Sequence, residues 1–174
     1  MKRILICMLM MACSMAVSAQ TNRAFKKGYE GNIEIGNYAV FGKDKYGTLI
    51  QATTTHGYRT GTGMFLGLGL GIAYDAVTEA PEIPVFMDAK YNFVDAAVSP
   101  FVSARSGLRF SGDYRNEMFQ PFIAVSGGVD TGRFTVKLGY DYGNVRKKEY
   151  PPYSSHITVI TKPSQWFCSF AIKF

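Results

Sequence analysis

The sequence predicts an all-β protein, an eight-stranded antiparallel up-and-down transmembrane β-barrel preceded by a cleavable signal peptide. Three observations support this fold class. Hydrophobic and polar residues alternate along eight segments, the links between segments alternate in length, and no segment after the leader is long and apolar enough to span a bilayer as a helix. The 174 residues, 47% of them hydrophobic and 18% charged, suit one folded domain and exclude a disordered chain.

Charge and motif content exclude several function classes. Lys and Arg total 19 against 13 Asp and Glu, and these basic residues form no long block, so no nucleic-acid partner is expected. Gly67, Gly69 and Gly71 lack the further glycine and the following helix of a dinucleotide-binding loop. The two histidines, His56 and His156, have no companion ligands at metal-binding spacing, so we expect neither a metal nor another cofactor.

The N-terminal segment has the features of an export signal. Lys2 and Arg3 precede the apolar run Ile4–Ala12, and small residues end at Ala19, where we expect cleavage. An alternative is a lipoprotein in which Cys13 carries the lipid. The chain is thereby divided into a signal peptide at 1–19 and a barrel domain at 20–174.

Alternation defines the four N-terminal strands, of which the first two are the most polar. In the first, Ile33 and Ile35 oppose Asn32 and Glu34, and successive side chains of a strand point to opposite faces. The third alternates large apolar residues with small ones. These strands are expected at Gly28–Val40, Tyr46–Tyr58, Met64–Tyr74 and Ile83–Phe93.

The four C-terminal strands follow the same pattern, which is clearest in the seventh. There Phe134, Val136 and Leu138 fall on one face, and Thr135 and Lys137 fall on the other. These strands are expected at Pro100–Phe110, Pro121–Val129, Arg133–Tyr142 and Gln165–Phe174.

Short and long links alternate along the chain, which is typical of a transmembrane barrel with short periplasmic turns and longer external loops. The short links are expected at Arg59–Thr62, Val94–Val98 and Asp130–Gly132. The longer links are expected at Phe41–Lys45, Asp75–Glu82, Gly112–Glu117 and Arg146–Lys162.

Residue size indicates which face meets the lipid. The apolar face carries Leu, Ile, Phe, Tyr and Met, whereas the polar face is built mainly from Gly, Ala, Ser and Thr, which suit the narrow lumen of an eight-stranded barrel. A soluble barrel with an apolar cavity is the alternative. Aromatic residues near strand ends fit interfacial girdles: Tyr29, Tyr58, Tyr74, Phe93, Phe110, Phe119, Tyr142, Trp166 and Phe174.

Charged residues of both signs fall on the lumen face. They are Glu30, Glu34, Asp88, Lys90, Arg105, Arg109, Lys137, Asp141 and Lys173. Because an unpaired buried charge costs several kcal/mol, we expect a network of ion pairs in which Glu34 meets Arg105 or Lys137. The alternative is that these residues line a water-filled pore.

With these features the chain resembles the small outer-membrane β-barrels of Gram-negative bacteria, the OmpA/OmpX-like class. The resemblance covers Gln20 to Phe174 and rests on the strand pattern, on Thr54-Thr55-His56-Gly57-Tyr58 and Ser99-Pro100-Phe101-Val102, and on the final aromatic residue. It implies an outer-membrane location and contact with membrane lipid and lipopolysaccharide. It also implies recognition by the barrel-assembly machinery through the last strand, with Phe170, Ile172 and Phe174 as the signal.

The class includes anchors, adhesion factors, narrow pores and lipid-modifying enzymes, so it leaves the activity open. We expect a non-enzymatic structural or surface-interaction role, with a narrow pore as the first alternative. Arg146, Lys147 and Lys148 in the longest link are candidate contacts for lipopolysaccharide phosphates or an extracellular partner. A lipid-modifying enzyme is less favoured, and its best candidate triad is Ser154 or Ser155 with His156 and Glu149.

Overall fold

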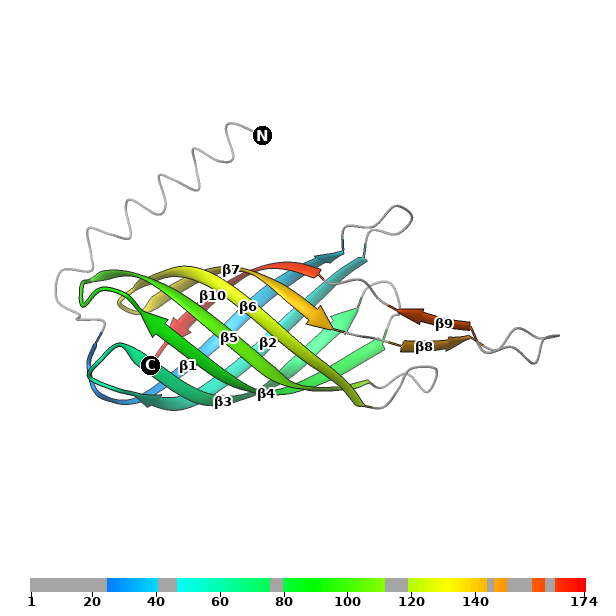
Figure 1. Cartoon of the computed structure of the whole chain (residues 1–174), viewed down its shortest axis with the longest axis horizontal. Coiled ribbons are helices and arrows are strands. Elements are labelled where there is room, and N and C mark those ends of the chain that lie inside the picture. Colours follow the sequence, from blue (N-terminus) through cyan, green and yellow to red (C-terminus); the bar gives the residue numbers. More distant parts are fainter. Residues whose placement is uncertain are drawn as a thin grey trace, which may run out of the picture.

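The computed structural model describes residues 25–40, 47–75, 80–111, 119–143, 146–149, 158–161 and 165–174. Eight long strands form a closed barrel (Figure 1). Their bounds are β1 (Gly28–Val40), β2 (Gly47–Arg59), β3 (Met64–Asp75), β4 (Ala80–Asn92), β5 (Val98–Ser111), β6 (Phe119–Thr131), β7 (Phe134–Gly143) and β10 (Gln165–Lys173). Two short strands, β8 (Arg146–Glu149) and β9 (Thr158–Thr161), form a separate two-stranded sheet.

The barrel has up-and-down topology, and every neighbouring pair of strands is antiparallel. The strand order is β1-β10-β7-β6-β5-β4-β3-β2, so each strand pairs with the barrel strand next to it in sequence and β1 closes on β10. The closing seam runs from the pair Asn32 and Lys173 to the pair Ala39 and Trp166. The prediction of an eight-stranded antiparallel barrel is therefore confirmed.

Several strands extend further than the sequence predicted. Arg59, placed in a turn by the sequence pattern, is the last residue of β2, and Asp130 lies inside β6. The segment Ala80–Glu82, expected in a link, begins β4, whereas Arg133, expected to start a strand, lies in the turn before β7. In β2, β4 and β6 the added residues continue the alternation of inward and outward side chains, so these strands are longer than expected.

The link expected at Arg146–Lys162 contains regular structure. Residues of β8 pair antiparallel with β9, from Arg146 opposite Thr161 to Glu149 opposite Thr158. This hairpin projects from the end of the barrel opposite the C-terminus (Figure 1). The segment is still the link between β7 and β10, but Arg146, Lys147 and Lys148 belong to a strand within it, which the sequence pattern did not predict.

The two faces of the sheet are strongly different. On the outside, Leu68 and Leu138 are 65% and 63% exposed, whereas on the inside Asp88 and Lys137 are 3% and 4% exposed. This arrangement confirms the predicted faces and rules out a barrel with an apolar interior and a polar exterior. Within the described ranges, no helix is long and apolar enough to cross a membrane.

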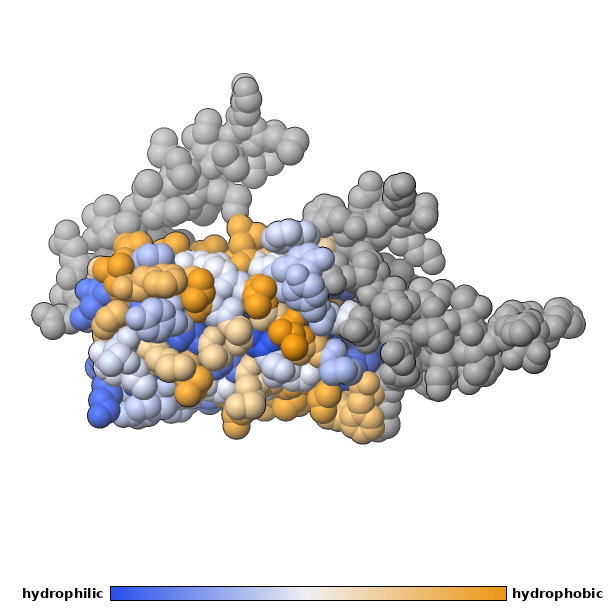
Figure 2. All heavy atoms as spheres, viewed as in Figure 1, coloured by the Kyte–Doolittle hydropathy of each residue, from blue (hydrophilic) through white to orange (hydrophobic). Residues whose placement is uncertain are grey.

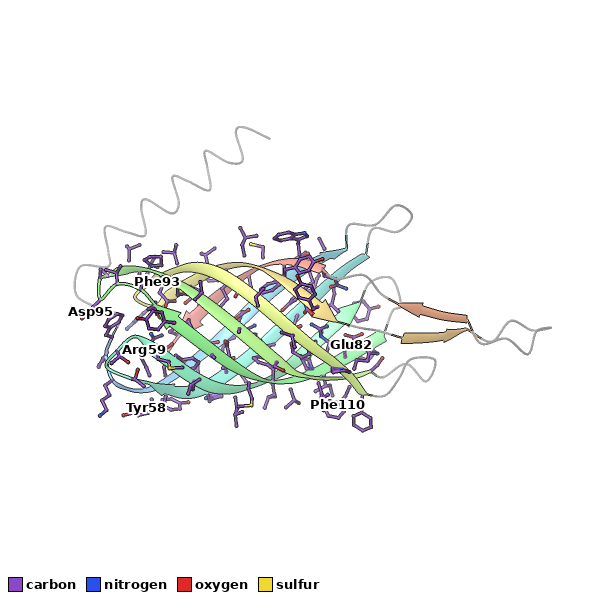
Figure 3. All side chains as sticks on the ribbon, viewed as in Figure 1. Tyr58, Arg59, Glu82, Phe93, Asp95 and Phe110 are labelled. Atoms are coloured by element: carbon purple, nitrogen blue, oxygen red, sulfur yellow. The ribbon has the colours of Figure 1, made fainter. Side chains whose placement is uncertain are left out.

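Aromatic side chains on the outer surface lie at both ends of the barrel. Figure 3 shows Tyr58 and Phe93 at one end and Phe110 at the other. Between them the outer wall consists largely of exposed aliphatic residues, and Figure 2 shows hydrophobic residues along the length of the barrel on the face in view. An apolar band bordered by aromatic girdles is the surface of a transmembrane barrel.

Candidate functional site

Four charged residues form the centre of the lumen, and we call them the central cluster: Glu34, Asp88, Arg105 and Lys137. The Arg105 guanidinium donates to both oxygens of Glu34, at 2.9 and 2.5 Å, and from Nε to Asp88 at 3.0 Å. The Lys137 ammonium donates to Glu34 at 2.7 Å. Two carboxylates and two cations thus share one buried site, and Glu34 meets both partners considered from the sequence.

Strand register brings the central cluster together. Asp88 on β4 and Arg105 on β5 are directly opposite each other in the ladder, so their contact is local to one hairpin. Glu34 enters from β1, and its contact with Arg105 on β5 crosses the lumen, whereas its contact with Lys137 on β7 spans the intervening strand β10. The side chains of all four residues are only 3–4% exposed, so the charges are compensated by each other rather than by bulk water.

A second group of charges lies nearer the end with the short turns, and we call it the rim cluster: Glu30, Arg59, Lys90, Asp130 and Lys173. Arg59 donates two hydrogen bonds to Glu30, at 2.5 and 2.8 Å. Lys90 bridges Glu30 at 3.3 Å and Asp130 at 3.2 Å, and Lys173 lies 3.4 Å from Asp130.

Neutral side chains complete the hydrogen bonds of the rim cluster. The Asn92 amide donates to Asp130 at 2.9 Å and accepts from Arg59 at 2.7 Å, and the Thr135 hydroxyl also donates to Asp130. Arg59, Asn92 and Asp130 were not among the site residues expected from the sequence. Arg59 and Asp130 each continue the alternation of their strand by one position, and that signal identifies them once the strand is extended into the expected turn. Asn92 lies on the polar face of the expected strand Ile83–Phe93, but it carries no charge and was not counted among the lumen charges.

The remaining two lumen charges expected from the sequence pair with each other. Arg109 on β5 donates to Asp141 on β7, and both are buried. The Arg109 guanidinium also lies over the ring of Phe122, 4.2 Å from its centroid. All nine charged residues expected in the lumen thus fall into the central cluster, the rim cluster or this pair.

Aromatic rings fill the lumen between the charges. Arg105 lies 4.8 Å from the ring centroid of Phe86, and Lys90 lies 5.5 and 5.3 Å from those of Phe65 and Phe101. These rings are 1–3% exposed. The lumen face was expected to consist mainly of small residues, and the pattern did not predict this aromatic filling. The rings exclude water and give the cations a second favourable contact.

Glycines opposite the rings make the filling possible. The Phe86 ring covers Gly69 on the neighbouring strand, where an added Cβ would overlap the ring. The Phe167 ring covers Gly139 in the same way. The lumen glycines therefore provide space for an aromatic neighbour, in addition to fitting a narrow tube.

The last strand places its three expected assembly residues on the outer face, where Phe170, Ile172 and Phe174 are exposed. Phe174 exchanges two backbone hydrogen bonds with Gly31, both 2.9 Å long. Its ring lies over Gly31, where a Cβ would come within 2.5 Å of it. Phe174 thus continues the β1–β10 seam by one further residue.

The described part of the chain contains no group of three or more His, Cys, Asp or Glu side chains able to hold a metal ion. Ser154, Ser155 and His156, which were considered for catalysis, lie outside the described residues, as do residues 1–19 with Cys13. For Glu149, and for the basic residues of β8, only the backbone is described.

A closed eight-stranded barrel with an apolar outer band and a charged, filled lumen has the architecture of the small outer-membrane β-barrels, the OmpA/OmpX-like fold. Among solved structures, Neisserial surface protein A is similar to this chain, with a TM-score of 0.61 and 13% identity over 85% of this chain and 97% of that one. At this identity the likeness concerns the fold. No protein-family model and no curated protein matches the sequence.

Two further structures show weaker similarity. One is the N-terminal β-barrel domain of Pseudomonas aeruginosa OprF, with a TM-score of 0.47 and 15% identity over 86% of this chain and 100% of that one. The other is the de novo designed protein TMB2.3, with a TM-score of 0.41 and 11% identity over 89% of this chain and 96% of that one.

Proposed function

We propose that the protein is a non-conducting, non-enzymatic barrel of the Gram-negative outer membrane that anchors the segments between its strands at the membrane surface. The observation that carries this proposal is the filled lumen at the central cluster. Glu34, Asp88, Arg105 and Lys137 are each 2–4% exposed, whereas side chains lining a water-filled passage are accessible to water.

Energetics support a lumen that stays closed. Opening a passage through the central cluster separates Arg105 from Glu34 and Asp88 in surroundings with little water. Removing one partner from a buried ion pair costs about 3–5 kcal/mol, so a state with several separated charges is rarely populated. The cation–π contact of Arg105 with Phe86 adds to this cost.

Planar-bilayer recording tests the proposal. We expect the wild-type barrel to give no discrete conductance steps, and the double variant Glu34→Ala/Arg105→Ala, which removes the pair joined by two hydrogen bonds across the lumen, to give steps. Leu68→Ala on the outer wall is the matched control and is expected to remain silent. Wild-type steps whose ion selectivity changes in Arg105→Gln would contradict the proposal and favour the narrow pore.

The surface-interaction part of the proposal concerns the β8–β9 hairpin. A short sheet carries Arg146, Lys147 and Lys148 beyond the barrel, which supports contact with lipopolysaccharide phosphates or an extracellular partner. Binding to vesicles with and without lipopolysaccharide, compared between wild type and Arg146→Gln/Lys147→Gln/Lys148→Gln, tests it. Equal binding by the two proteins would show that Arg146, Lys147 and Lys148 do not contribute to this contact.

Location and assembly are tested in cells. We expect the protein in the outer-membrane fraction, and we expect replacement of Phe174 by Ala to lower its yield there through weaker recognition by the barrel-assembly machinery. Turnover of lipid A or phospholipid by the purified protein, lost in His156→Ala, would instead support the lipid-modifying enzyme. No turnover by the wild type would end that alternative.

A further inference from the structure

Three polar side chains stand together on the lipid-facing wall, close to the end with the short turns. We call Tyr29, Thr54 and His56 the outer trio. The Tyr29 hydroxyl is 2.5 Å from Nδ1 of His56, and Nε2 of His56 is 2.9 Å from the Thr54 hydroxyl oxygen. Thr54 in turn donates to the backbone oxygen of Asn32 at 3.2 Å. Polar groups on this wall face acyl chains, so their arrangement requires an explanation.

The hydrogen bonds of the outer trio run in one direction. Because the Thr54 proton points to Asn32, the Thr54 oxygen accepts from Nε2–H of His56, and in the neutral imidazole Nδ1 then accepts from the Tyr29 hydroxyl. A single neutral tautomer of His56 therefore satisfies every donor. On the lipid side, the trio can therefore only accept further hydrogen bonds, above all at the lone pair of the Tyr29 hydroxyl oxygen.

Two members of the outer trio, Tyr29 and His56, line one end of an apolar groove on the outside of the barrel. The groove has a volume of about 900 Å³ and crosses β2 to β6. Its floor consists of small residues, including Ala89, Ala104 and Ser106, and its walls include Leu68 and Met87. A groove with an apolar floor on a membrane-facing wall is suited to an acyl chain.

Tyr29 also lines a second hollow, which opens at the rim of the barrel. This hollow has a volume of about 380 Å³ and is bordered by Lys26, Lys27 and Arg133, all of them exposed cations. Tyr29 thus joins an apolar groove to a cationic rim. From the bilayer core toward the rim, the outer wall presents first the apolar groove, then the Tyr29 oxygen with its exposed ring, and then the cations of the rim.

A phosphate at the cations with an acyl chain in the groove fits a glycerophospholipid, and the two-carbon arm beyond the phosphate folds back so that its end reaches Tyr29. We propose that the groove, the outer trio and the adjoining rim bind one glycerophospholipid with an ethanolamine headgroup. An acyl chain lies in the groove, the phosphate meets Lys26 or Lys27, and the primary ammonium donates a hydrogen bond to the Tyr29 oxygen. The end with short turns faces the periplasm in outer-membrane barrels, so the bound lipid belongs to the periplasmic leaflet.

The acceptor character of the trio determines headgroup selectivity. An ethanolamine ammonium has N–H donors, and the exposed rings of Tyr29 and Tyr58 add cation–π attraction. A choline headgroup keeps its positive charge but has no N–H, so it leaves the Tyr29 oxygen without a donor. One hydrogen bond corresponds to a preference for ethanolamine over choline lipid of about three- to tenfold.

Native mass spectrometry of the full-length barrel in detergent, titrated with dioleoyl phosphatidylethanolamine or dioleoyl phosphatidylcholine, tests the headgroup contact. We expect the wild type to retain one ethanolamine lipid at about three- to tenfold lower concentration than the choline lipid. Tyr29→Phe should bind both lipids equally. Tyr58→Phe, a matched tyrosine lining the same groove, should keep the preference.

A second pair of variants tests the groove. Ala104→Phe fills its floor and should lower retention of both lipids at least tenfold, whereas Val85→Phe, on the outer wall of β4 but not in the groove, should not. Retention of the folded, heat-modifiable gel mobility ensures that each variant is assembled. Equal retention of the two lipids by the wild type, or full retention by Ala104→Phe, overturns the proposal.

The lipid site rests on the membrane-barrel architecture and on no other part of the proposed function. A barrel that conducts ions but retains ethanolamine lipid through Tyr29 would overturn the proposal of a closed lumen alone. A silent barrel without lipid preference would overturn the lipid site alone.

Discussion

The inner and outer walls of the barrel hold polar groups in surroundings with little water, but they satisfy them by different means. On the inner wall, Glu34 and Arg105 are full charges whose contacts cross the lumen between strands distant in sequence. On the outer wall, His56 and Thr54 are neutral and bond within one strand, and Tyr29 joins them from the adjacent strand.

The difference follows from what lies beyond each wall. The lumen is enclosed by the barrel, so a charge there can be surrounded by counter-charges and aromatic rings on several sides. The outer wall has protein on one side only, and a charge facing the acyl chains has no partner there. Charged networks are therefore possible inside, while the outside permits short neutral hydrogen-bond chains.

The largest expected effect is on the inner wall. Arg105→Ala leaves Glu34 and Asp88 with Lys137 as their remaining central cation, and we expect the free energy of unfolding to fall by about 3–5 kcal/mol. Urea unfolding in lipid vesicles measures it. Arg105→Ala/Glu34→Ala should recover part of the loss, because the uncompensated carboxylate is removed as well. A loss below about 1 kcal/mol, the range of exposed ion pairs, would place the cluster in contact with water.

Placing a charge on the outer wall should be the next most costly change. Leu68 lies near the middle of β3 and is 65% exposed to the surroundings of the barrel. Leu68→Arg is expected to destabilise the folded state by about 2–4 kcal/mol in a bilayer, the cost of an arginine at the midplane. Leu68→Ala is the control for lost side-chain volume. Equal stability of the Arg and Ala variants would mean that this face does not meet lipid.

Packing of the lumen predicts a smaller effect at Gly69. A Cβ at this position overlaps the ring of Phe86, so Gly69→Ala should cost about 1–3 kcal/mol through overpacking. Gly61, whose added Cβ meets nothing within 4 Å, provides the control substitution Gly61→Ala. The same unfolding assay applies, and a neutral Gly69→Ala would mean that the Phe86 ring has free space to move into.

The smallest effect is expected in the outer trio. Thr54→Val keeps the side-chain shape but removes the hydroxyl that accepts from His56, and hydrogen bonds of this kind in membranes average roughly 0.6 kcal/mol. Ser106→Ala on the same outer wall is the comparison. A loss in Thr54→Val as large as that in Arg105→Ala would abolish the distinction drawn between the two walls.

The alternation of residues was sufficient to predict the eight barrel strands and their faces, but not the short strands β8 and β9. A period of two is a local property, and it identifies Leu138 as outward and Lys137 as inward without knowledge of any partner. Strand ends were less predictable, because Arg59 and Asp130 stand beside turn residues and were assigned to the turns. Charged residues are common in exposed turns, but Arg59 and Asp130 instead form ion pairs inside the lumen, in the rim cluster.

Contacts that depend on register could not be derived from the pattern. The pairing of Phe86 with Gly69 and of Phe167 with Gly139 requires the alignment of neighbouring strands, which turn lengths near Val94 or Arg59 do not determine. The contact of Glu34 with both Arg105 and Lys137 requires the circumference of the closed barrel as well. The outer trio was missed because His56 was considered only as a metal ligand and not by its neighbours across the β1–β2 pair.

The composition of the central cluster bears on how the barrel inserts. Its four side chains come from β1, β4, β5 and β7, so no single hairpin contains more than the Asp88 and Arg105 pair. A sheet in which β1 has not yet paired with β10 therefore carries Glu34 without its counter-ions from β5 and β7. The free-energy cost of these unpaired charges is removed only when the barrel closes. Entry into the bilayer should consequently be all-or-none, with half-inserted forms scarce at equilibrium.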